Sequence, residues 1–92
     1  MNVRFTLEAL THIATIRSYI KLRSPAAAAH VIERIFADAE RLEEFPHLGH
    51  VGVVPGTHEL KVRGLPYIVV HEVHDDKNEV IVIGVFHGAR QR

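Results

Sequence analysis

The stretch THELKVRGLPYIVVHEVHDDKNEVIVIGVFHGAR, from Thr57 to Arg90, decides the fold. It contains three apolar runs, rich in Val and Ile, that are separated by turn residues at 64–66 and 75–78. Runs of this length with such boundaries are typical of β-strands. The second turn is short, so the runs on either side of it should pair antiparallel as a hairpin. The stretch therefore predicts a three-strand antiparallel meander, with strands at 58–62, 67–70 and 80–86.

The first run alternates in polarity, with Leu60 and Val62 on one face and Glu59, Lys61 and Arg63 on the other. Side chains of a strand point alternately to its two faces, so we expect a buried apolar face and a solvated charged face. An exposed Arg63 predicts that its replacement by alanine lowers the free energy of unfolding by no more than about 0.5 kcal/mol. The other two runs are almost entirely apolar, as expected of strands that are covered on both faces.

Residues 1–24 predict a short strand followed by a helix. Val3 and Phe5 alternate with polar neighbours, and Thr6 is a good helix cap. The residues that follow place apolar side chains at helical spacing, so they should face the core. This inward stripe comprises Leu10, Ile13, Ile16 and Ile20, joined by Ala9, Ala14 and Tyr19.

A second helix is predicted from about Pro25 to Glu44. Ser24 can cap it, and Pro25 suits its first position, where no N–H donor is needed. Pro46 disfavours the helical conformation at Phe45 and so ends the helix there. The few residues between the two helices make them an antiparallel hairpin. The expected inward residues of the second helix are Ala28, Ile32, Ile35, Ala39 and Leu42.

The predicted order is a strand, two helices, a loop at 47–56 and three strands. This is an α+β fold, with a short N-terminal strand and an antiparallel helical hairpin on one face of the three-strand meander. The place of the first strand in the sheet stays open. A chain of 92 residues is one small domain, spanning residues 1–92.

The composition excludes several classes of protein. Lys plus Arg balances Asp plus Glu at 11 each, which argues against a protein that holds nucleic acid mainly through phosphate contacts. We therefore expect no sequence-specific DNA binding. The absence of cysteine excludes disulfides and zinc–thiolate sites and fits a reducing cytoplasm. No apolar run approaches the roughly 20 residues of a membrane helix, and no signal peptide is visible.

Eight histidines raise the question of a metal site. His47 and His50 lie in a predicted loop. His71 and His74 are an odd number of residues apart, so on a strand they point to opposite faces. His58 and His87 would meet only if their strands were neighbours in the right register. Because no cysteine or carboxylate cluster completes a ligand set, we expect scattered surface histidines, no metal and no cofactor.

Several phrases of the sequence resemble the ParE toxins of the RelE/ParE superfamily of toxin–antitoxin systems. They are Gly56-Thr57-His58-Glu59-Leu60, Val62-Arg63-Gly64-Leu65-Pro66-Tyr67, His87-Gly88-Ala89-Arg90, the hairpin phrase Pro25-Ala26-Ala27-Ala28, and Phe45-Pro46 followed by Gly49. The resemblance spans nearly the whole chain. It implies a small bacterial toxin of the cytoplasm, neutralised by a ParD-type antitoxin in a hetero-oligomer. ParE members are associated with poisoning DNA gyrase, and RelE members cut messenger RNA on the ribosome.

The sequence lacks several residues that RelE-type toxins share and that RNA cleavage would use. Cleavage through the 2′-hydroxyl needs a base, an acid and cations that stabilise the charged phosphorane. RelE-type toxins resemble one another in an Arg just after the Tyr of the third strand, where this chain has Ile68. They also often carry a Tyr or His near the C-terminus, and no Tyr follows Tyr67 here. The remaining candidates are Lys61, Arg63, His87 and Arg90, with Glu59 beside them as a carboxylate.

We therefore predict a toxin without a catalytic site. Lys61, Arg63, His87 and Arg90 are expected to contact gyrase from the exposed end or face of the sheet, because Arg is well suited to anchor an interface. The alternative is a ribosome-dependent endoribonuclease of the RelE type that uses the same residues. A third interpretation is an inactivated toxin that acts only as an interaction module.

The first helix carries more apolar surface than one core contact needs, which predicts a second neighbour. We expect an amphipathic helix of the antitoxin to dock beside the helical hairpin. Arg17, Lys21 and Arg23 would border this groove and favour an acidic partner segment. The alternative is that the first helix simply lies deep in a small fold. The expected antitoxin contacts are Leu10, Ile13, Ile16, Arg17, Tyr19 and Ile20.

Overall fold

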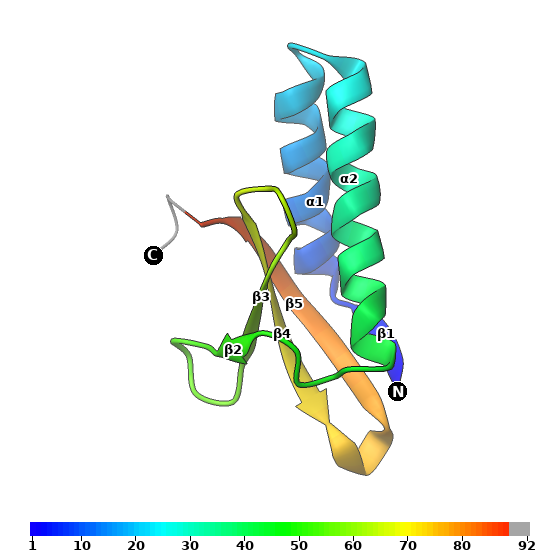
Figure 1. Cartoon of the computed structure of the whole chain (residues 1–92), viewed down its shortest axis with the longest axis vertical. Helices are drawn as coiled ribbons and strands as arrows, with labels where there is room; N and C mark the ends of the chain where they lie inside the picture. The colour runs from blue at the N-terminus through cyan, green and yellow to red at the C-terminus, as the bar shows by residue number, and fades with distance from the viewer. Residues whose placement is uncertain (89–92) are drawn as a thin grey trace.

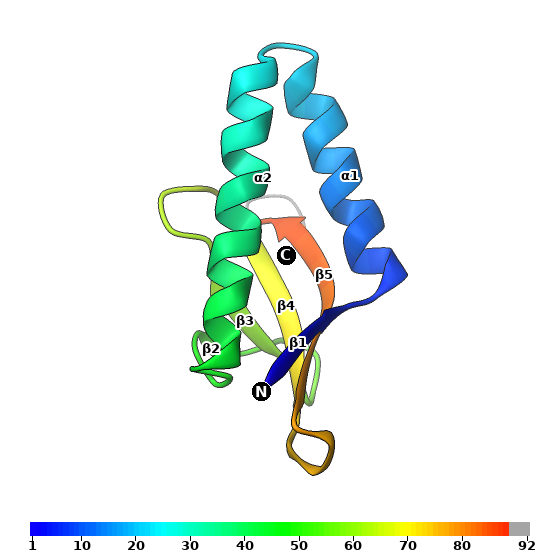
Figure 2. The ribbon, with the colours of Figure 1, turned by 90° about the vertical axis from the view of Figure 1, so that its right-hand side faces the viewer.

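The chain forms a five-stranded sheet with two helices on one of its faces (Figures 1 and 2). The computed structural model describes residues 1–88. The predicted α+β class, N-terminal strand, helical hairpin and meander are confirmed. In chain order the elements are β1 (Asn2–Phe5), α1 (Leu7–Lys21), α2 (Pro25–Glu40), the 3₁₀ turn η1 (Arg41–Glu43), β2 (His50–Val51), β3 (His58–Lys61), β4 (Tyr67–His74), the 3₁₀ turn η2 (Asp75–Lys77) and β5 (Glu79–His87).

The sheet has the strand order β1-β5-β4-β3-β2. The predicted meander of β3, β4 and β5 is antiparallel and forms its centre. β1, whose place the sequence left open, pairs parallel with β5 at one edge, from Asn2 opposite Glu79 to Phe5 opposite Val82. β2 pairs antiparallel with β3 at the other edge. The sequence predicts a loop at this place, and that prediction is wrong because two residues of the segment pair with β3.

β4 and β5 are longer than predicted, and their pairing contains one bulge. The register shifts by one residue after Val70 and leaves Ile83 without a partner in β4. One extra residue reverses the alternation of faces along a strand. Val80 and Val82 before the bulge and Val85 after it therefore all face the helices and join the core. The bulge keeps the helix-facing side of β5 apolar along its full length.

Both helices begin at the predicted caps. The Thr6 hydroxyl accepts a hydrogen bond from the Ala9 N–H, and the Ser24 hydroxyl accepts one from the Ala27 N–H, both at 3.1 Å. α2 ends at Glu40, earlier than predicted, because the chain tightens into the 3₁₀ turn η1. Within the part of the chain that the structure describes, neither helix is long and apolar enough to cross a membrane.

The core lies between the sheet and the helical hairpin. The inward residues predicted for α2 and its extension are buried, apart from Ile32, which is half-buried. Sheet and hairpin thus share one continuous apolar interface. Its largest fully buried apolar side chains are Ile35, Leu42, Val62, Val69, Val80 and Val82.

The stripe predicted on α1 is only partly inward. Ile13 is buried, but Leu10 and Tyr19 are 43% and 53% exposed, and Ile16 and Ile20 are half-buried. Figure 2 shows the reason, because the hairpin extends beyond the end of the strands, so that the end of α1 has no sheet behind it. Ala14 is exposed as well. Leu10 and Tyr19 lie about two and a half turns apart, so they point to opposite flanks of the helix.

A buried carboxylate holds the turn between β3 and β4 against α2. Asp38 is fully buried and accepts hydrogen bonds from the Arg63 backbone N–H at 2.8 Å and from the Arg63 guanidinium at 2.7 and 2.9 Å. Burial raises the pKa of Asp38, but the hydrogen bonds and charge of Arg63, with Arg41 at 3.9 Å, outweigh burial and hold this pKa below its ordinary value. Arg34 also donates to the Arg63 carbonyl at 2.9 Å. The expectation of a freely solvated Arg63 is therefore wrong.

Arg63→Ala should lower the free energy of unfolding by about 2 kcal/mol, because Asp38 then loses its side-chain hydrogen bonds. Breaking a fully buried pair costs roughly 3–5 kcal/mol, and the 58% exposure of the Arg63 side chain reduces this cost. Urea denaturation at pH 7 measures the change. Lys61→Ala, which removes an exposed cation from the adjoining strand, is the control and should stay within about 0.5 kcal/mol. An equally small loss for Arg63→Ala would contradict the anchoring role.

Candidate functional site

The sheet face that points away from the helices is here called the open face, and the part of it formed by Ile68, Val70, Ile83 and Phe86 is apolar. Alternation along β3 places Lys61 on this face, and the register puts Ile68 of β4 and then Phe86 of β5 across from it. Lys61 is exposed, and it is the only Lys or Arg within β3, β4 and β5. The open face therefore presents aliphatic and aromatic side chains with little positive charge.

Glu59 is buried, contrary to the prediction of a solvated charged face on β3. Its side chain is 5% exposed, because β2 pairs alongside it, with His50 opposite Glu59. The carboxylate accepts a hydrogen bond from the Val53 N–H at 3.2 Å and lies 3.5 Å from the His50 Nε2. The sequence did not indicate this, since the covering strand is only two residues long.

A hollow of about 510 Å³ lies in the open face, between the sheet and the loop that joins β2 to β3. Figure 1 shows this loop on the side of the sheet away from the helices. Val53 and Val54 of the loop are 79% and 61% exposed. This surface was not predicted, although the run of valines at 51–54 signals it. The lining residues are Val53, Val54, Thr57, Glu59, Val70, Ile83 and Phe86.

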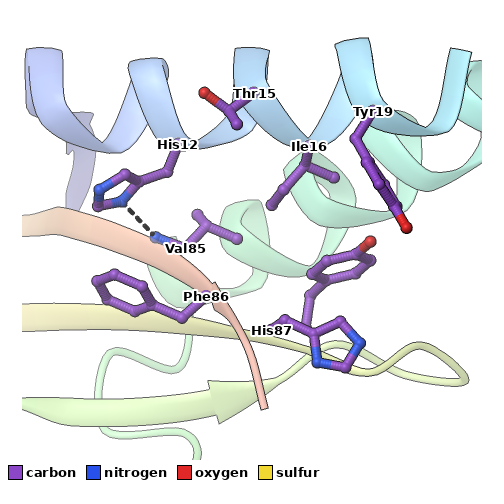
Figure 3. A pocket seen from close by; sticks show the side chains of 8 residues that line it. His12, Thr15, Ile16, Tyr19, Val85, Phe86 and His87 are labelled. Atoms are coloured by element: carbon purple, nitrogen blue, oxygen red, sulfur yellow. Dashed lines mark hydrogen bonds between the residues drawn. The ribbon is translucent and has the colours of Figure 1, made fainter. Parts of the chain in front are cut away.

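A second depression, here called the β5 groove, lies between α1 and the end of β5 (Figure 3). β1 ends opposite Val82, so among residues 1–88 no strand pairs with the rest of β5 on that side. His12 of α1 accepts a hydrogen bond from the Val85 N–H through Nδ1 at 3.2 Å, and its ring lies 4.8 Å from that of Phe86. A Cβ at Gly84 would lie 2.7 Å from the Phe86 ring, so the absence of a side chain at Gly84 leaves room for this ring. The groove holds about 500 Å³ and is lined by His12, Thr15, Ile16, Tyr19, Tyr67, Val85, Phe86 and His87.

The residues predicted to bind the target do not form one cluster within residues 1–88. Lys61 lies on the open face, and Arg63 is bound to Asp38 beside α2. His87 lies opposite Tyr67 and lines the β5 groove, where the two rings are 5.6 Å apart. Arg90 lies outside the described residues.

The residues predicted to bind the antitoxin divide among three sides of α1. Ile13 is buried at 5% exposure, and Ile20 packs against the core. Ile16 and Tyr19 line the β5 groove. Leu10 points to the opposite flank, and Arg17 lines a smaller groove between the two helices together with Lys21. Only Ile16 and Tyr19 of the predicted set therefore share one accessible surface, and the sequence missed their neighbours His12 and Phe86.

Three histidines converge on the helix-facing side of the sheet. His58 lies opposite His71 and stacks on it at 5.6 Å, and the His47 ring meets His58 at 5.5 Å. His71 is fully buried with its Nε2 3.1 Å from the Pro46 carbonyl oxygen, so the expectation of scattered surface histidines is wrong for it. Burial, more than any other cause, lowers the pKa of His71. No group of three metal-ligating side chains occurs in the described chain.

Comparisons with known proteins cover nearly the whole chain. A family model described as "ParE toxin of type II toxin-antitoxin system, parDE" matches residues 3–92. The protein named "Putative toxin Y4kP" of Sinorhizobium fredii (strain NBRC 101917 / NGR234) is 35% identical over 90 residues, which are 98% of this chain and 91% of that protein. These matches concern the sequence along its full length.

Two solved structures have a similar fold. A chain of the chromosomal ParDE TA system from P. aeruginosa gives a TM-score of 0.83 at 20% sequence identity, over 95% of each chain. A chain of the intact E. coli RelBE toxin–antitoxin complex gives 0.66 at 26% identity, over 91% of this chain and 92% of that one. At such identities the likeness concerns mainly the arrangement of the helical hairpin and the sheet.

Proposed function

Because the chain belongs to the ParE toxins of type II toxin–antitoxin systems, we propose that it blocks DNA gyrase by binding and catalyses no reaction of its own. It acts in the bacterial cytoplasm, where a ParD-like antitoxin neutralises it. A ribosome-dependent endoribonuclease of the RelE type is the alternative. The two activities make opposite demands on the open face, since one needs contacts to a protein and the other needs contacts to RNA.

The observation that carries the proposal is the apolar part of the open face, formed by Ile68, Val70, Ile83 and Phe86. Ile68 directly follows Tyr67 and lies beside Phe86, at the position where the resemblance to RelE-type toxins calls for an Arg. Lys61 supplies the only positive charge of the three central strands. RNA binding depends on neutralising phosphates with several cations, whereas protein interfaces are depleted of charge at their centres. The open face therefore fits a protein target better.

One feature of the open face favours the alternative. Glu72 and His74 at the far end of β4 are 2.9 Å apart and could act as an acid–base pair. Arg4 shares this end of the sheet, but Glu79 engages it at 3.6 Å. Two carboxylates and one guanidinium give this region a negative balance, which repels phosphate. The charge around the pair therefore favours binding over cleavage.

Expression of the chain without an antitoxin should stop cell division and induce the DNA damage response while bulk translation continues. The purified chain should also inhibit supercoiling of plasmid DNA by gyrase, because binding to the enzyme is its whole action. Primer extension on messenger RNA during expression is the discriminating measurement. Cleavage at fixed codon positions within minutes, with supercoiling unaffected, would reject gyrase as the target and establish the endoribonuclease.

We also propose that an apolar segment of the antitoxin binds in the β5 groove. Tyr19 is 53% exposed at the rim, Ile16 is half-buried below it, and within residues 1–88 no strand pairs with β5 on its β1 side beyond Val82. Figure 3 shows the side chains of α1 and β5 that line the two walls of this groove. A groove of about 500 Å³ between a helix and an open strand edge fits an amphipathic segment of a partner. The toxin–antitoxin complexes among the similar structures support such a partner.

Tyr19→Asp should weaken antitoxin binding by about tenfold or more, because it places a charge at the rim of an apolar contact. Leu7→Asp is the control, since Leu7 is 80% exposed and starts α1 away from the groove. Calorimetric titration of a ParD-like antitoxin against both variants measures the effect, and thermal melting checks that both are folded. Equal affinities for the two variants would place the antitoxin elsewhere.

A further inference from the structure

Three imidazole rings lie in a row that leads from the surface to the interior on the helix-facing side of the sheet. His47 is exposed, His58 is half-buried and His71 is fully buried. The ring centroids of His47 and His58 are 5.5 Å apart, and those of His58 and His71 are 5.6 Å apart. The rings come from the chain before β2, from β3 and from β4. The row therefore joins the chain that leads into β2 to the middle of the sheet.

A hydrogen bond to the chain before β2 fixes the tautomer of the His71 ring. The Nε2 atom lies 3.1 Å from the Pro46 carbonyl oxygen, which only accepts, so in the neutral ring Nε2 carries the proton and Nδ1 carries none. Nδ1 is buried and has no hydrogen-bond partner within residues 1–88. A proton added to this ring therefore brings a positive charge and a second N–H into a buried site, which is costly.

No opposite charge compensates a protonated His71 within residues 1–88. Burial has the largest effect and lowers the pKa of His71, and the neighbouring His58 and His47 lower this pKa as well. The backbone groups of Pro46 and Val69 act in the opposite direction but do not offset burial. The charge of a protonated ring is therefore disfavoured for as long as the ring stays covered.

The ionisable groups on the surrounding elements are engaged or placed elsewhere. Val82, which lies opposite His71 on β5, has no charge. Alternation along the strands puts the carboxylates nearest in sequence on the opposite face of the sheet. The groups concerned are Glu59 of β3, Glu72 and His74 of β4, Asp38 of α2, which binds Arg63, and Arg41, Glu43 and Glu44 at the end of the helical hairpin.

Residues 45–57, here called the β2 segment, have few other attachments to the sheet within the described chain. Leu48 packs against the core, and β2, which is two residues long, pairs with β3. Val51, Val53 and Val54 are exposed. Figure 1 shows the segment passing from the end of α2 to the far edge of the sheet. A segment with few buried contacts opens locally at a low free energy, while the central strands stay paired.

We propose that the row of histidines is a pH-sensitive latch that holds the β2 segment on the sheet. Near neutral pH, the neutral His71 ring donates its Nε2 proton to the Pro46 carbonyl and keeps the segment closed. Below about pH 6 the ring takes up a second proton when the segment moves away and admits water, so acid favours the open segment. Opening displaces the exposed valines beside the hollow of the open face. This effect on target binding rests on the proposed function, whereas the opening itself does not.

Proton uptake sets the direction of the effect. The open segment lets His71 reach water and bind a proton that the closed segment excludes, so the closed form is lost as the pH falls. One such proton changes the ratio of closed to open forms by up to about tenfold per pH unit, starting near pH 6.5. His50 acts the other way, because its Nε2 lies 3.5 Å from the Glu59 Oε1 and a proton on His50 strengthens this contact. Loss of His71 should therefore remove the response to acid, and loss of His50 should increase it.

Amide hydrogen exchange of the ¹⁵N-labelled chain, measured by NMR from about pH 7.5 to pH 5, tests the latch. The Gly52 and Val53 amides report on the closed segment, since they donate to the Thr57 carbonyl and to the Glu59 carboxylate. After correction for the intrinsic exchange rate at each pH, their protection should fall by about tenfold or more towards pH 5. Amides between β4 and β5 should stay protected.

His71→Gln keeps an N–H donor near the place of Nε2 but takes up no proton, so the protection of Gly52 and Val53 should stay constant with pH. His30→Gln is the matched control, because His30 is exposed on α2, and it should respond like the parent chain. His50→Gln should lose more protection in acid than the parent. Thermal melting at pH 7.5 checks that the three variants are folded.

Constant protection of the β2 segment in the parent chain would overturn the latch, and so would an equal loss throughout β4 and β5. A folded His71→Gln chain that responds like the parent would overturn it as well. If His71→Gln does not fold, His50→Gln decides, because a loss no larger than that of the parent would contradict the opposing roles of the two histidines.

Gyrase binding separates the latch from the proposed function. The parent chain should bind immobilised gyrase about tenfold more weakly at pH 5.5 than at pH 7.5, relative to the same ratio for His71→Gln. A parent chain that opens in acid but binds gyrase at neither pH would uphold the latch and reject gyrase as the partner. A parent chain that binds gyrase while its β2 segment stays protected at both pH values would overturn the latch alone.

Discussion

The pairing of β4 with β5, with one extra residue at Ile83, is the constraint on which the rest of the structure depends. Because the bulge reverses the alternation of faces, Val80, Val82 and Val85 all reach the core, and Ile83 is left to line the open face. β5 extends further than β1, which ends opposite Val82. The end of β5 is therefore covered by α1. One strand pairing thus creates both the apolar hollow and the β5 groove.

These two surfaces share Phe86, which lines both, but they differ in chemistry. The β5 groove is bounded by a helix and an open strand edge, which is the geometry that accepts a segment of a partner chain. The hollow is a compact depression with a buried carboxylate and an exposed apolar rim, which is the geometry of an interface centre. Apart from Phe86, the two surfaces are lined by different residues, so an antitoxin and a target would contact mostly different side chains.

Local patterns in the sequence were sufficient for the meander, the helix caps and the hairpin, because strand alternation and capping residues act over a few positions. Contacts between distant residues were not predictable in the same way. Arg63 looks solvated on its strand, yet its partner Asp38 lies 25 residues earlier. Glu59 is buried by a strand of two residues that carries no periodic signal. The broad apolar cover of α1 indicated a second contact, but only the three-dimensional position of β5 shows that Ile16 and Tyr19 line the groove.

If gyrase is the target, the open face, and not the helical hairpin, contacts it. Hydrogen–deuterium exchange of the chain, with and without gyrase, tests it most directly, since amide exchange reports protection residue by residue. Exchange in the β2–β3 loop, residues 52–57, should slow by about tenfold or more when gyrase is added, while the hairpin tip at residues 20–26 stays unchanged. Protection confined to the hairpin, or no protection in the loop, would contradict it.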